Sequence, residues 1–319
     1  MQLRYEQRHF CLSRESSGRN IHVPLVETGA DSLWFGKICC PLNEVWDFNE
    51  REVIASAFAR RLGLPGPEVV MVNLPDGVVN FDDLKAALLE FAVKDKTNLI
   101  GIYWDENGRR TDWVKKLFEL QSGHIPWERM VAVRWVAGAI PLRNWPGEVE
   151  HLRNLESLLQ SIVFNLWFGN HDGNMDLNVI ADNTDAGWCV DFGYSGPGQR
   201  RNMGVNVNGN KFDDFGTTHR RRYYNKLLPS KLIDFVRQQS DGGYRLLEPM
   251  VERIASLSKQ ELQDALSNTG YQLALPGEHK TNAIATTKIL EELSRRQSLL
   301  RDKVRWFCEN AQSLEENVA

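Results

Sequence analysis

Hydrophobic and polar residues alternate through the N-terminal part of the chain, and this alternation is the period of a half-buried β-strand. Strands are predicted at residues 8–13, 21–28 and 32–40. Because short polar or glycine-containing turns separate them, the three segments are expected to form an antiparallel meander. A further strand is predicted at residues 68–74, where five of the seven residues are apolar.

Between the last two of these strands the apolar residues change to a helical period. Asn49 is the predicted N-cap of this helix, Gly63 is the predicted residue after its C-terminus, and Pro65 stands beyond it. One predicted face carries the apolar side chains of Val53, Ile54, Ala57, Phe58 and Leu62.

The strongest helical pattern of the chain covers residues 148–168, where leucine, isoleucine and valine form a wide apolar stripe that stops at Gly169. Two short strands, 177–181 and 188–190, are predicted after it, joined by a polar turn. Residues 229–314 are predicted to be mostly helical, and no internal repeat is evident.

The middle of the chain gives weaker patterns, with helices predicted at 81–93 and 113–121 and a strand at 99–104. Strands thus dominate the first part and helices the second, which indicates an α+β class and not βαβ alternation. We place the boundary near residue 110. The expected architecture is a β-rich N-lobe (1–110) and a mainly helical C-lobe (111–319), together forming one bilobed domain.

Composition excludes several classes of protein. Hydrophobic residues make up 42% of the 319 residues and charged residues 25%, which are globular values. The formal net charge of −4 argues against direct DNA binding. No apolar run is long enough for a membrane span, and the N-terminus shows no secretory pattern. Five cysteines without a C-x-x-C pair favour a reducing, cytoplasmic setting over a disulfide framework.

Candidate chemistry gathers around the two predicted strands at 177–181 and 188–190. Asp172 lies in the loop that leaves the long helix, Asn178 opens the first strand, and Asp191 closes the returning one. Facing ends of an antiparallel hairpin lie about 5 Å apart, so Asn178 and Asp191 are candidate ligands of one Mg²⁺ ion. Asp172 would orient and deprotonate a hydroxyl nucleophile, as the catalytic aspartate of a kinase does.

The N-terminal part offers residues for the phosphates of ATP. Lys37 lies within a predicted strand, and Glu52 lies on the following helix, where it could pair with Lys37. The loop containing Ser16, Ser17 and Gly18 joins the first two predicted strands, and its backbone N–H groups could cover phosphates.

In three segments the chain resembles the HipA-like serine/threonine kinases, a family with a protein-kinase-like fold. The segments are Lys37-Ile-Cys-Cys with the helix from Glu52 into Leu62-Gly-Leu-Pro-Gly-Pro-Glu68, then Trp167-Phe-Gly-Asn-His-Asp172, and Val190-Asp-Phe-Gly193. The resemblance covers roughly residues 8–195. It implies that Asp172 is the catalytic base, that Asn178 and Asp191 bind Mg²⁺, and that Lys37 binds ATP.

The same resemblance implies a protein Ser or Thr as phosphate acceptor and a small antitoxin-like protein as partner, since members of the family often act as toxins. It also implies regulation by autophosphorylation of a loop serine, here Ser16 or Ser17. The chain departs from the kinase pattern H-R-D-x-x-x-x-N in one respect: Asn178 follows Asp172 by six residues, not five, so Asn174 is an alternative ligand.

Other interpretations remain open for several of these residues. Glu52 could instead complete a capping box with Asn49, in which case Glu50 is the alternative partner of Lys37. The acidic and amide residues from 172 to 178 alternate as in a calcium loop but lack its glycine and final glutamate. The basic run 218–226 is either a solvated helix start or a phosphate-binding segment.

Two further functions compete with a protein kinase. One is a small-molecule phosphotransferase, because the same fold hosts such enzymes. The other is a catalytically weak pseudokinase that binds partners in a nucleotide-dependent way, and the extra loop residue after Asp172 keeps this interpretation open.

Overall fold

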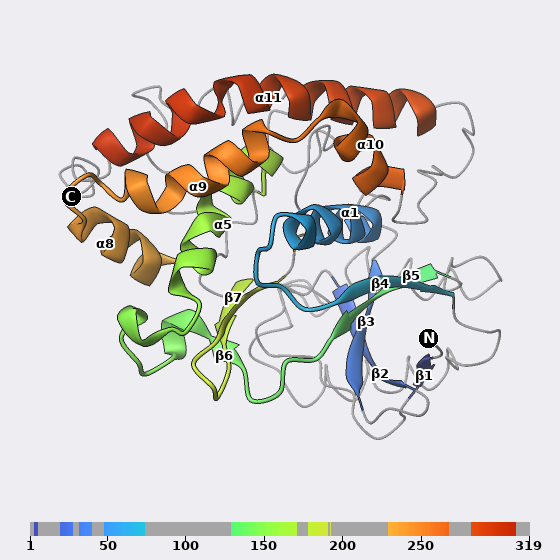
Figure 1. The fold of residues 1–319 in the computed structure, drawn as a ribbon. Helices are drawn as coiled ribbons and strands as arrows, with labels where there is room; N and C mark the ends of the chain where they lie inside the picture. Colours follow the sequence, from blue (N-terminus) through green and yellow to red (C-terminus); the bar gives the residue numbers. More distant parts are fainter. Residues whose placement is uncertain are drawn as a thin grey trace, which may run out of the picture. The chain divides into compact units, whose positions relative to one another are not determined.

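A computed structural model describes the chain at residues 3–5, 20–27, 32–39, 48–73, 129–170, 178–190, 192, 229–267 and 282–310. Figure 1 shows these parts of the chain as a coloured ribbon. The chain divides into two compact units, one of residues 1–49 and 68–135, the other of residues 50–67 and 136–319. The boundary predicted near residue 110 lies outside the described residues.

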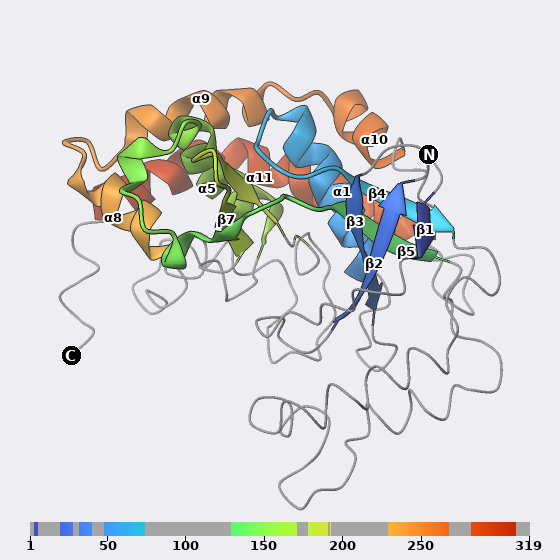
Figure 2. The same ribbon diagram turned by 90° about the horizontal axis from the view of Figure 1, so that it is seen from below.

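The first unit contains an antiparallel sheet of five described strands in the order β1-β2-β3-β5-β4 (Figure 2). The strands are β1 (Leu3–Tyr5), β2 (Asn20–Glu27), β3 (Leu33–Cys39), β4 (Val69–Asn73) and β5 (Arg129–Arg134). The strands predicted at 21–28, 32–40 and 68–74 are therefore confirmed. The strand predicted at 8–13 lies outside the described residues.

Strand β5 was not predicted, and it occupies the position between β3 and β4. Its residues Val131, Ala132 and Val133 are all buried, so neighbouring side chains are covered on both faces of the sheet. A strand buried on both faces loses the alternation of apolar and polar residues that a sequence pattern can detect.

Helix α1 (Phe48–Arg61) belongs to the second unit from residue 50 on; its apolar face is buried at Ile54 and Phe58, and Leu62, directly after the helix, is buried as well. The helix starts one residue before the predicted N-cap, Asn49. The helix ends as predicted: Gly63 has a φ of +73°, and the amide of Leu64 donates to the carbonyl of Ala59 at 2.9 Å. This is the pattern of a glycine-terminated helix.

The remaining elements of the second unit include a three-stranded antiparallel sheet in the order β6-β7-β8. Its strands are β6 (Ile140–Pro141), β7 (Val179–Ala181) and β8 (Gly187–Cys189). The hairpin predicted around residues 182–187 is thus confirmed, whereas β6 was not predicted. Two short 3-10 helices, η2 (Leu142–Asn144) and η3 (Val149–His151), precede the next helix.

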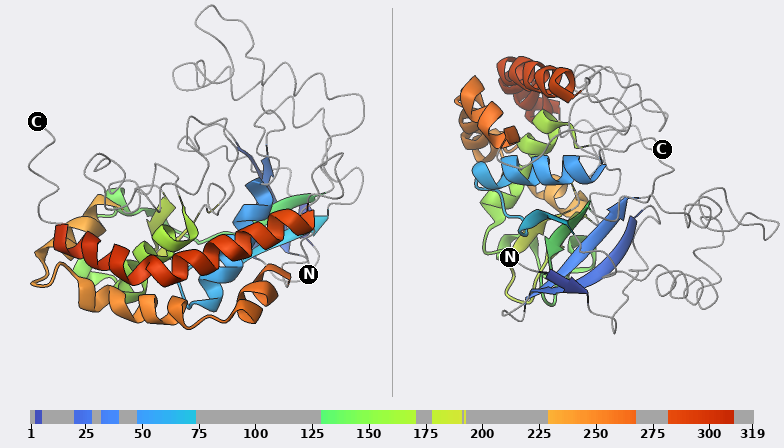
Figure 3. Two further views of the ribbon diagram at one scale, coloured as in Figure 1. Left: turned by 90° about the horizontal axis from the view of Figure 1, so that it is seen from above. Right: turned by 90° about the vertical axis from the view of Figure 1, so that its right-hand side faces the viewer.

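Five α-helices among the described residues complete the unit: α5 (Leu155–Phe168), α8 (Ser230–Gln238), α9 (Tyr244–Ala255), α10 (Lys259–Ser267) and α11 (Asn282–Asn310). The last four confirm that residues 229–314 are mostly helical where the structure describes them. Helices α5, α9 and α11 contact one another, and Figures 1 and 3 show α9 and α11 side by side. Every residue of α5 from Leu158 to Phe168 is buried, so α5 is the central helix of this core.

The prediction that this helix begins at residue 148 is wrong. The helix begins at Leu155, because Asn154 adopts a non-helical conformation (φ −124°, ψ 33°) and its side chain pairs with the backbone of Gly187. The Asn154 Oδ1 accepts from the Gly187 amide at 2.8 Å, and its Nδ2 donates to the Gly187 carbonyl at 2.8 Å. This long-range pairing outweighs the helical pattern of residues 149–154.

The predicted helices at 81–93 and 113–121 and the strand at 99–104 lie outside the described residues. Where the structure describes the chain, it is a mixed α and β protein with antiparallel sheets and several helices.

Candidate functional site

The open end of the β7–β8 hairpin is the best-defined part of the candidate site. Val179 is paired with Cys189, and one step earlier the amide of Val190 donates to the carbonyl of Asn178 at 2.8 Å. Asn178 is buried, with a 6% exposed surface. Asp191 follows Val190 directly in the sequence, although its own position lies outside the described residues. The register therefore places Asn178 opposite Val190, the residue before Asp191, and the binding of one Mg²⁺ ion by Asn178 and Asp191 stays a prediction.

The other end of this hairpin is held by Asp182. Its Oδ1 accepts from the amides of Thr184 (2.8 Å) and Ala186 (3.1 Å) and from the Thr184 hydroxyl (2.7 Å), and its Oδ2 accepts from the Trp188 indole (2.9 Å). Burial would raise the pKa of Asp182, but these hydrogen bonds outweigh burial and lower the pKa below its ordinary value. The carboxylate is thus ionised and structural.

We predict that Asp182→Asn destabilises the protein by about 1–3 kcal/mol, because an amide nitrogen in place of Oδ2 leaves the Trp188 indole without its acceptor. Because the pKa of Asp182 is lowered in the folded state, the stabilisation by its carboxylate is complete well above pH 3.8 and is lost as the pH falls through the lowered pKa. The unfolding free energy of the variant should therefore fall less steeply than that of the wild type as the pH is lowered. Urea unfolding between pH 3 and 7 measures both effects, with exposed Asp185→Asn in the same turn as control; equal curves for the two variants would contradict the prediction.

The helix that leads to the predicted catalytic loop ends as the sequence indicates. Gly169 has a φ of 78°, and the amides of Gly169 and Asn170 both donate to the carbonyl of Asn165 at 2.9 Å. The Asn170 side chain also donates to the Asn165 side chain at 3.3 Å. Both asparagines are buried, so the chain leaves α5 in a defined direction at Asn170. Asp172 and Asn174 lie beyond it, outside the described residues.

The phenylalanine of the Val190-Asp-Phe-Gly193 segment is anchored in the core. Phe192 is 3% exposed and packs edge-on against Phe164, with ring centroids 5.7 Å apart and an interplanar angle of 86°. Phe164 in turn stacks on Phe168, at 5.4 Å and 8°. The chain is therefore held on both sides of Asp191, at Val190 by the hairpin and at Phe192 by this aromatic cluster.

The segment after α1 also lies beside the hairpin. The Cys189 amide donates to the carbonyl of Pro65 at 2.9 Å, which joins the Leu-Pro-Gly-Pro segment to strand β8. Burial raises the pKa of the Cys189 thiol to about 11, so this thiol is not a nucleophile near neutral pH.

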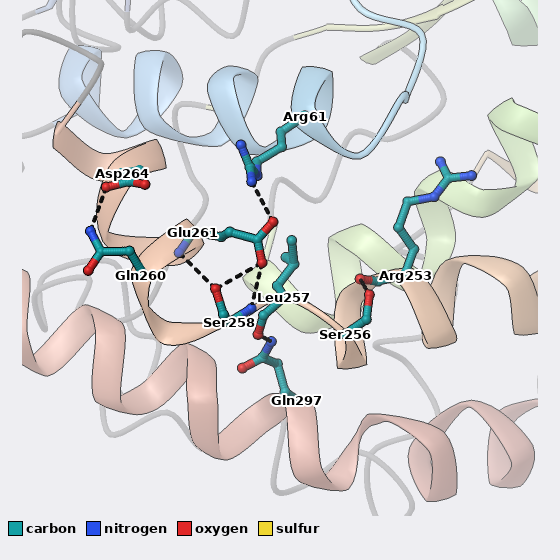
Figure 4. Close-up of polar contacts among 9 residues, drawn as sticks. All are labelled: Arg61, Arg253, Ser256, Leu257, Ser258, Gln260, Glu261, Asp264 and Gln297. Carbon is teal, nitrogen blue, oxygen red and sulfur yellow. Dashed lines mark hydrogen bonds and ion pairs between the residues drawn. The ribbon is translucent and has the colours of Figure 1, made fainter.

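The end of α1 is fixed to two other helices. The Arg253 side chain on α9 donates to the carbonyl of Leu62. Arg61 pairs with Glu261 on α10 at 2.6 Å, as Figure 4 shows. Glu261 also forms a capping box with Ser258: its Oε2 accepts from the Ser258 amide at 2.8 Å and hydroxyl at 2.9 Å. The Ser258 hydrogen bonds, with that of Arg61, lower the pKa of Glu261 to about 2.

Two further predicted residues are described, one in each unit. Lys37 lies on β3 opposite His22 and Val131 and is 7% exposed, and Glu52 lies on α1 and is 1% exposed. Both charged side chains are thus buried, which is unusual for lysine and glutamate. Their pairing stays a prediction, as do the roles of Ser16, Ser17 and Gly18, which lie outside the described residues.

One buried charged residue near the site was not predicted. Arg296 on α11 is 2% exposed, and its guanidinium donates to the carbonyl of Trp167, in the last turn of α5. A signal for it exists in the sequence. Arg296 interrupts an apolar stripe at helical spacing, formed by Ile289, Leu293, Leu300, Val304 and Phe307.

Within the described residues, no group of three or more His, Cys, Asp or Glu side chains could hold a metal ion, and both predicted carboxylates, Asp172 and Asp191, lie outside that part. Nor does any described helix have the length and apolar character to cross a membrane. No family model, curated protein or solved structure that we compared with the chain matches it. The HipA-like resemblance accordingly stays a prediction.

Proposed function

We propose that this chain is an ATP- and Mg²⁺-dependent kinase of HipA-like, bilobed architecture, which transfers the γ-phosphate of ATP to a Ser or Thr hydroxyl on a protein. The observation that carries the proposal is the register of the β7–β8 hairpin. Asn178 directly precedes β7, with its carbonyl bonded to the Val190 amide, and Asp191 follows Val190 in the chain. An amide and a carboxylate oxygen are hard ligands suited to Mg²⁺.

The distribution of the other residues supports the same chemistry. In a kinase-like fold the β-rich lobe carries the phosphate-binding lysine, and the helical lobe carries the catalytic loop and metal ligands. Here Lys37 belongs to the five-stranded sheet, and the segments bearing Asp172, Asn178 and Asp191 belong to the second unit. From its place in strand β3, the Lys37 ammonium would reach the phosphates of ATP.

In the proposed reaction each residue has one task. Lys37, oriented by Glu52, and the backbone of residues 16–18 hold the phosphates of ATP. Asn178 and Asp191 would hold a Mg²⁺ ion, which would supply positive charge to the phosphates of ATP. Asp172 accepts the proton of the acceptor hydroxyl while that oxygen attacks the γ-phosphorus in line and ADP leaves.

The proposal extends to the setting of the protein. A cytoplasmic kinase of this kind would act on a protein substrate and would be restrained by a small antitoxin-like protein that provides any DNA contact. A reconstituted pair eluting as one complex in size-exclusion chromatography would support this part of the proposal.

The test is phosphate transfer from γ-labelled ATP in the presence of Mg²⁺, with the protein alone and with cell lysate. We expect labelled protein bands that disappear in Asp172→Ala and in Asp191→Ala, since a positioned base alone contributes about 10²–10⁴-fold to rate. Label confined to small molecules would indicate a small-molecule phosphotransferase. ATP binding without transfer would reject the kinase and leave a pseudokinase.

A further inference from the structure

The C-terminal turn of α5 is held by a charged side chain from a distant part of the sequence. The Arg296 guanidinium on α11 donates from NH1 to the carbonyl of Trp167 at 3.0 Å and from Nε to Glu292 Oε1 at 2.8 Å. In the opposite direction, the Trp167 indole donates to the carbonyl of Leu293 at 3.0 Å. Each helix therefore donates one hydrogen bond to a backbone carbonyl of the other, and the paired residues are 126 and 129 positions apart in the sequence.

This contact supplies what α5 lacks in its own sequence. The last carbonyls of a helix have no partner within the helix, and a cation near them is favourable. The last turn of α5 contains no basic residue. Arg296 thus provides both a hydrogen-bond donor and a positive charge at this end.

The arginine is also charged and confined. Its exposed surface is 2%. Its partner Glu292 remains ionised, because the hydrogen bonds from Arg295 and Arg296 lower the pKa of Glu292 more than its burial raises it. A buried guanidinium is costly unless it is paired, and an apolar side chain would fill the same position at lower cost. Packing alone therefore does not explain an arginine here.

We propose that Arg296 is a positioning residue, which fixes the end of α5 and so sets the direction in which the chain continues through Gly169 and Asn170 toward Asp172. Trp167 is two residues before Gly169 and five before Asp172. Trp167 belongs to the same last turn of α5 as Asn165, whose carbonyl oxygen receives the amides of Gly169 and Asn170. The catalytic consequence of this inference rests on the proposed kinase function.

The test separates positioning from stability. Arg296→Met alone removes one of the two arginines that bind Glu292. The double variant Glu292→Met with Arg296→Met is therefore made as well, to remove both charges. Arg296→Lys keeps the charge but not the planar fork of donors. The control is Arg295→Met, because Arg295 binds the same carboxylate at 2.7 Å and is 40% exposed.

Hydrogen exchange followed by mass spectrometry is the readout that does not depend on activity. We expect the amides of residues 169 and 170 to exchange about tenfold faster or more in the double variant, as loss of a charged hydrogen bond at this end implies. Amides of β7, β8 and α9 should keep their wild-type rates. Acceleration spread evenly over the second unit, or none at residues 169 and 170, would overturn the inference.

Kinetics give the second readout. With labelled ATP, kcat should fall about 10²-fold through misplacement of the base while KM for ATP stays within about twofold. Arg296→Lys should recover part of kcat, and Arg295→Met should match the wild type. An active wild type with unchanged kcat in the double variant would overturn the inference. A wild type that transfers no phosphate would overturn the kinase proposal instead, and hydrogen exchange alone would then decide the role of Arg296.

Discussion

Replacing Asn178 with alanine is expected to lower the rate of phosphoryl transfer at a fixed Mg²⁺ concentration by at least about 10- to 100-fold. Loss of a residue that only hydrogen-bonds to a metal ligand already has an effect of that size, and Asn178 is proposed as a ligand itself. The hydrogen bond that Asn178 makes with Val190 uses the backbone carbonyl, so the variant retains it. The hairpin should therefore form, and higher Mg²⁺ should recover part of the rate. Initial rates measured against Mg²⁺ concentration test this.

The matched control for this variant is Asn183→Ala, the same substitution at an exposed position in the turn of the same hairpin. Its rate and Mg²⁺ dependence should equal those of the wild type. If Asn178→Ala behaved like Asn183→Ala while the wild type was active, Asn178 would not be the metal ligand, and Asn174 would become the candidate.

The largest effect on stability is expected for Phe164→Ala. Phe164 is fully buried on α5, and its ring contacts those of Trp167, Phe168 and Phe192. Removing a buried phenylalanine ring costs about 3–5 kcal/mol, which corresponds to a fall in melting temperature of roughly 6–20 °C. Differential scanning calorimetry measures this fall.

Phe164→Leu should cost less, because it keeps most of the apolar volume. Leu299→Ala is the control, since Leu299 is 37% exposed and its loss should change the unfolding free energy by about 0.5 kcal/mol or less. A melting temperature of Phe164→Ala equal to that of Leu299→Ala would show that the aromatic cluster around Phe192 does not stabilise the fold.

Short-range patterns predicted those elements whose conformation depends on neighbours in the sequence. Gly63 and Gly169 end their helices with positive φ, as glycine does at this position. The β7–β8 hairpin is confirmed with its polar turn, in which Asp182 accepts the amides of Thr184 and Ala186. These interactions join residues that are only a few positions apart, so a local pattern contains the information.

The errors have a common cause. Asn154 ends the helical pattern early because its side chain is bonded to Gly187, 33 residues away. Strand β5 went unpredicted because its side chains are buried on both faces, and because the strands β3 and β4 that pair with it lie far away in the sequence. In each case a partner outside the local window decides the conformation.

The residues of the candidate site show the same division between what the sequence determines and what the tertiary structure decides. The sequence by itself determined the residue types and their order: a lysine in a strand, a glutamate on the next helix, and Asp172, Asn178 and Asp191 around a hairpin. Only the tertiary structure decided that Asn178 stands opposite Val190, that Phe192 is anchored on Phe164, and that Arg296 holds the end of α5. The reason is physical, because backbone preference acts between neighbours, whereas burial and the pairing of a buried charge depend on which distant segments pack together.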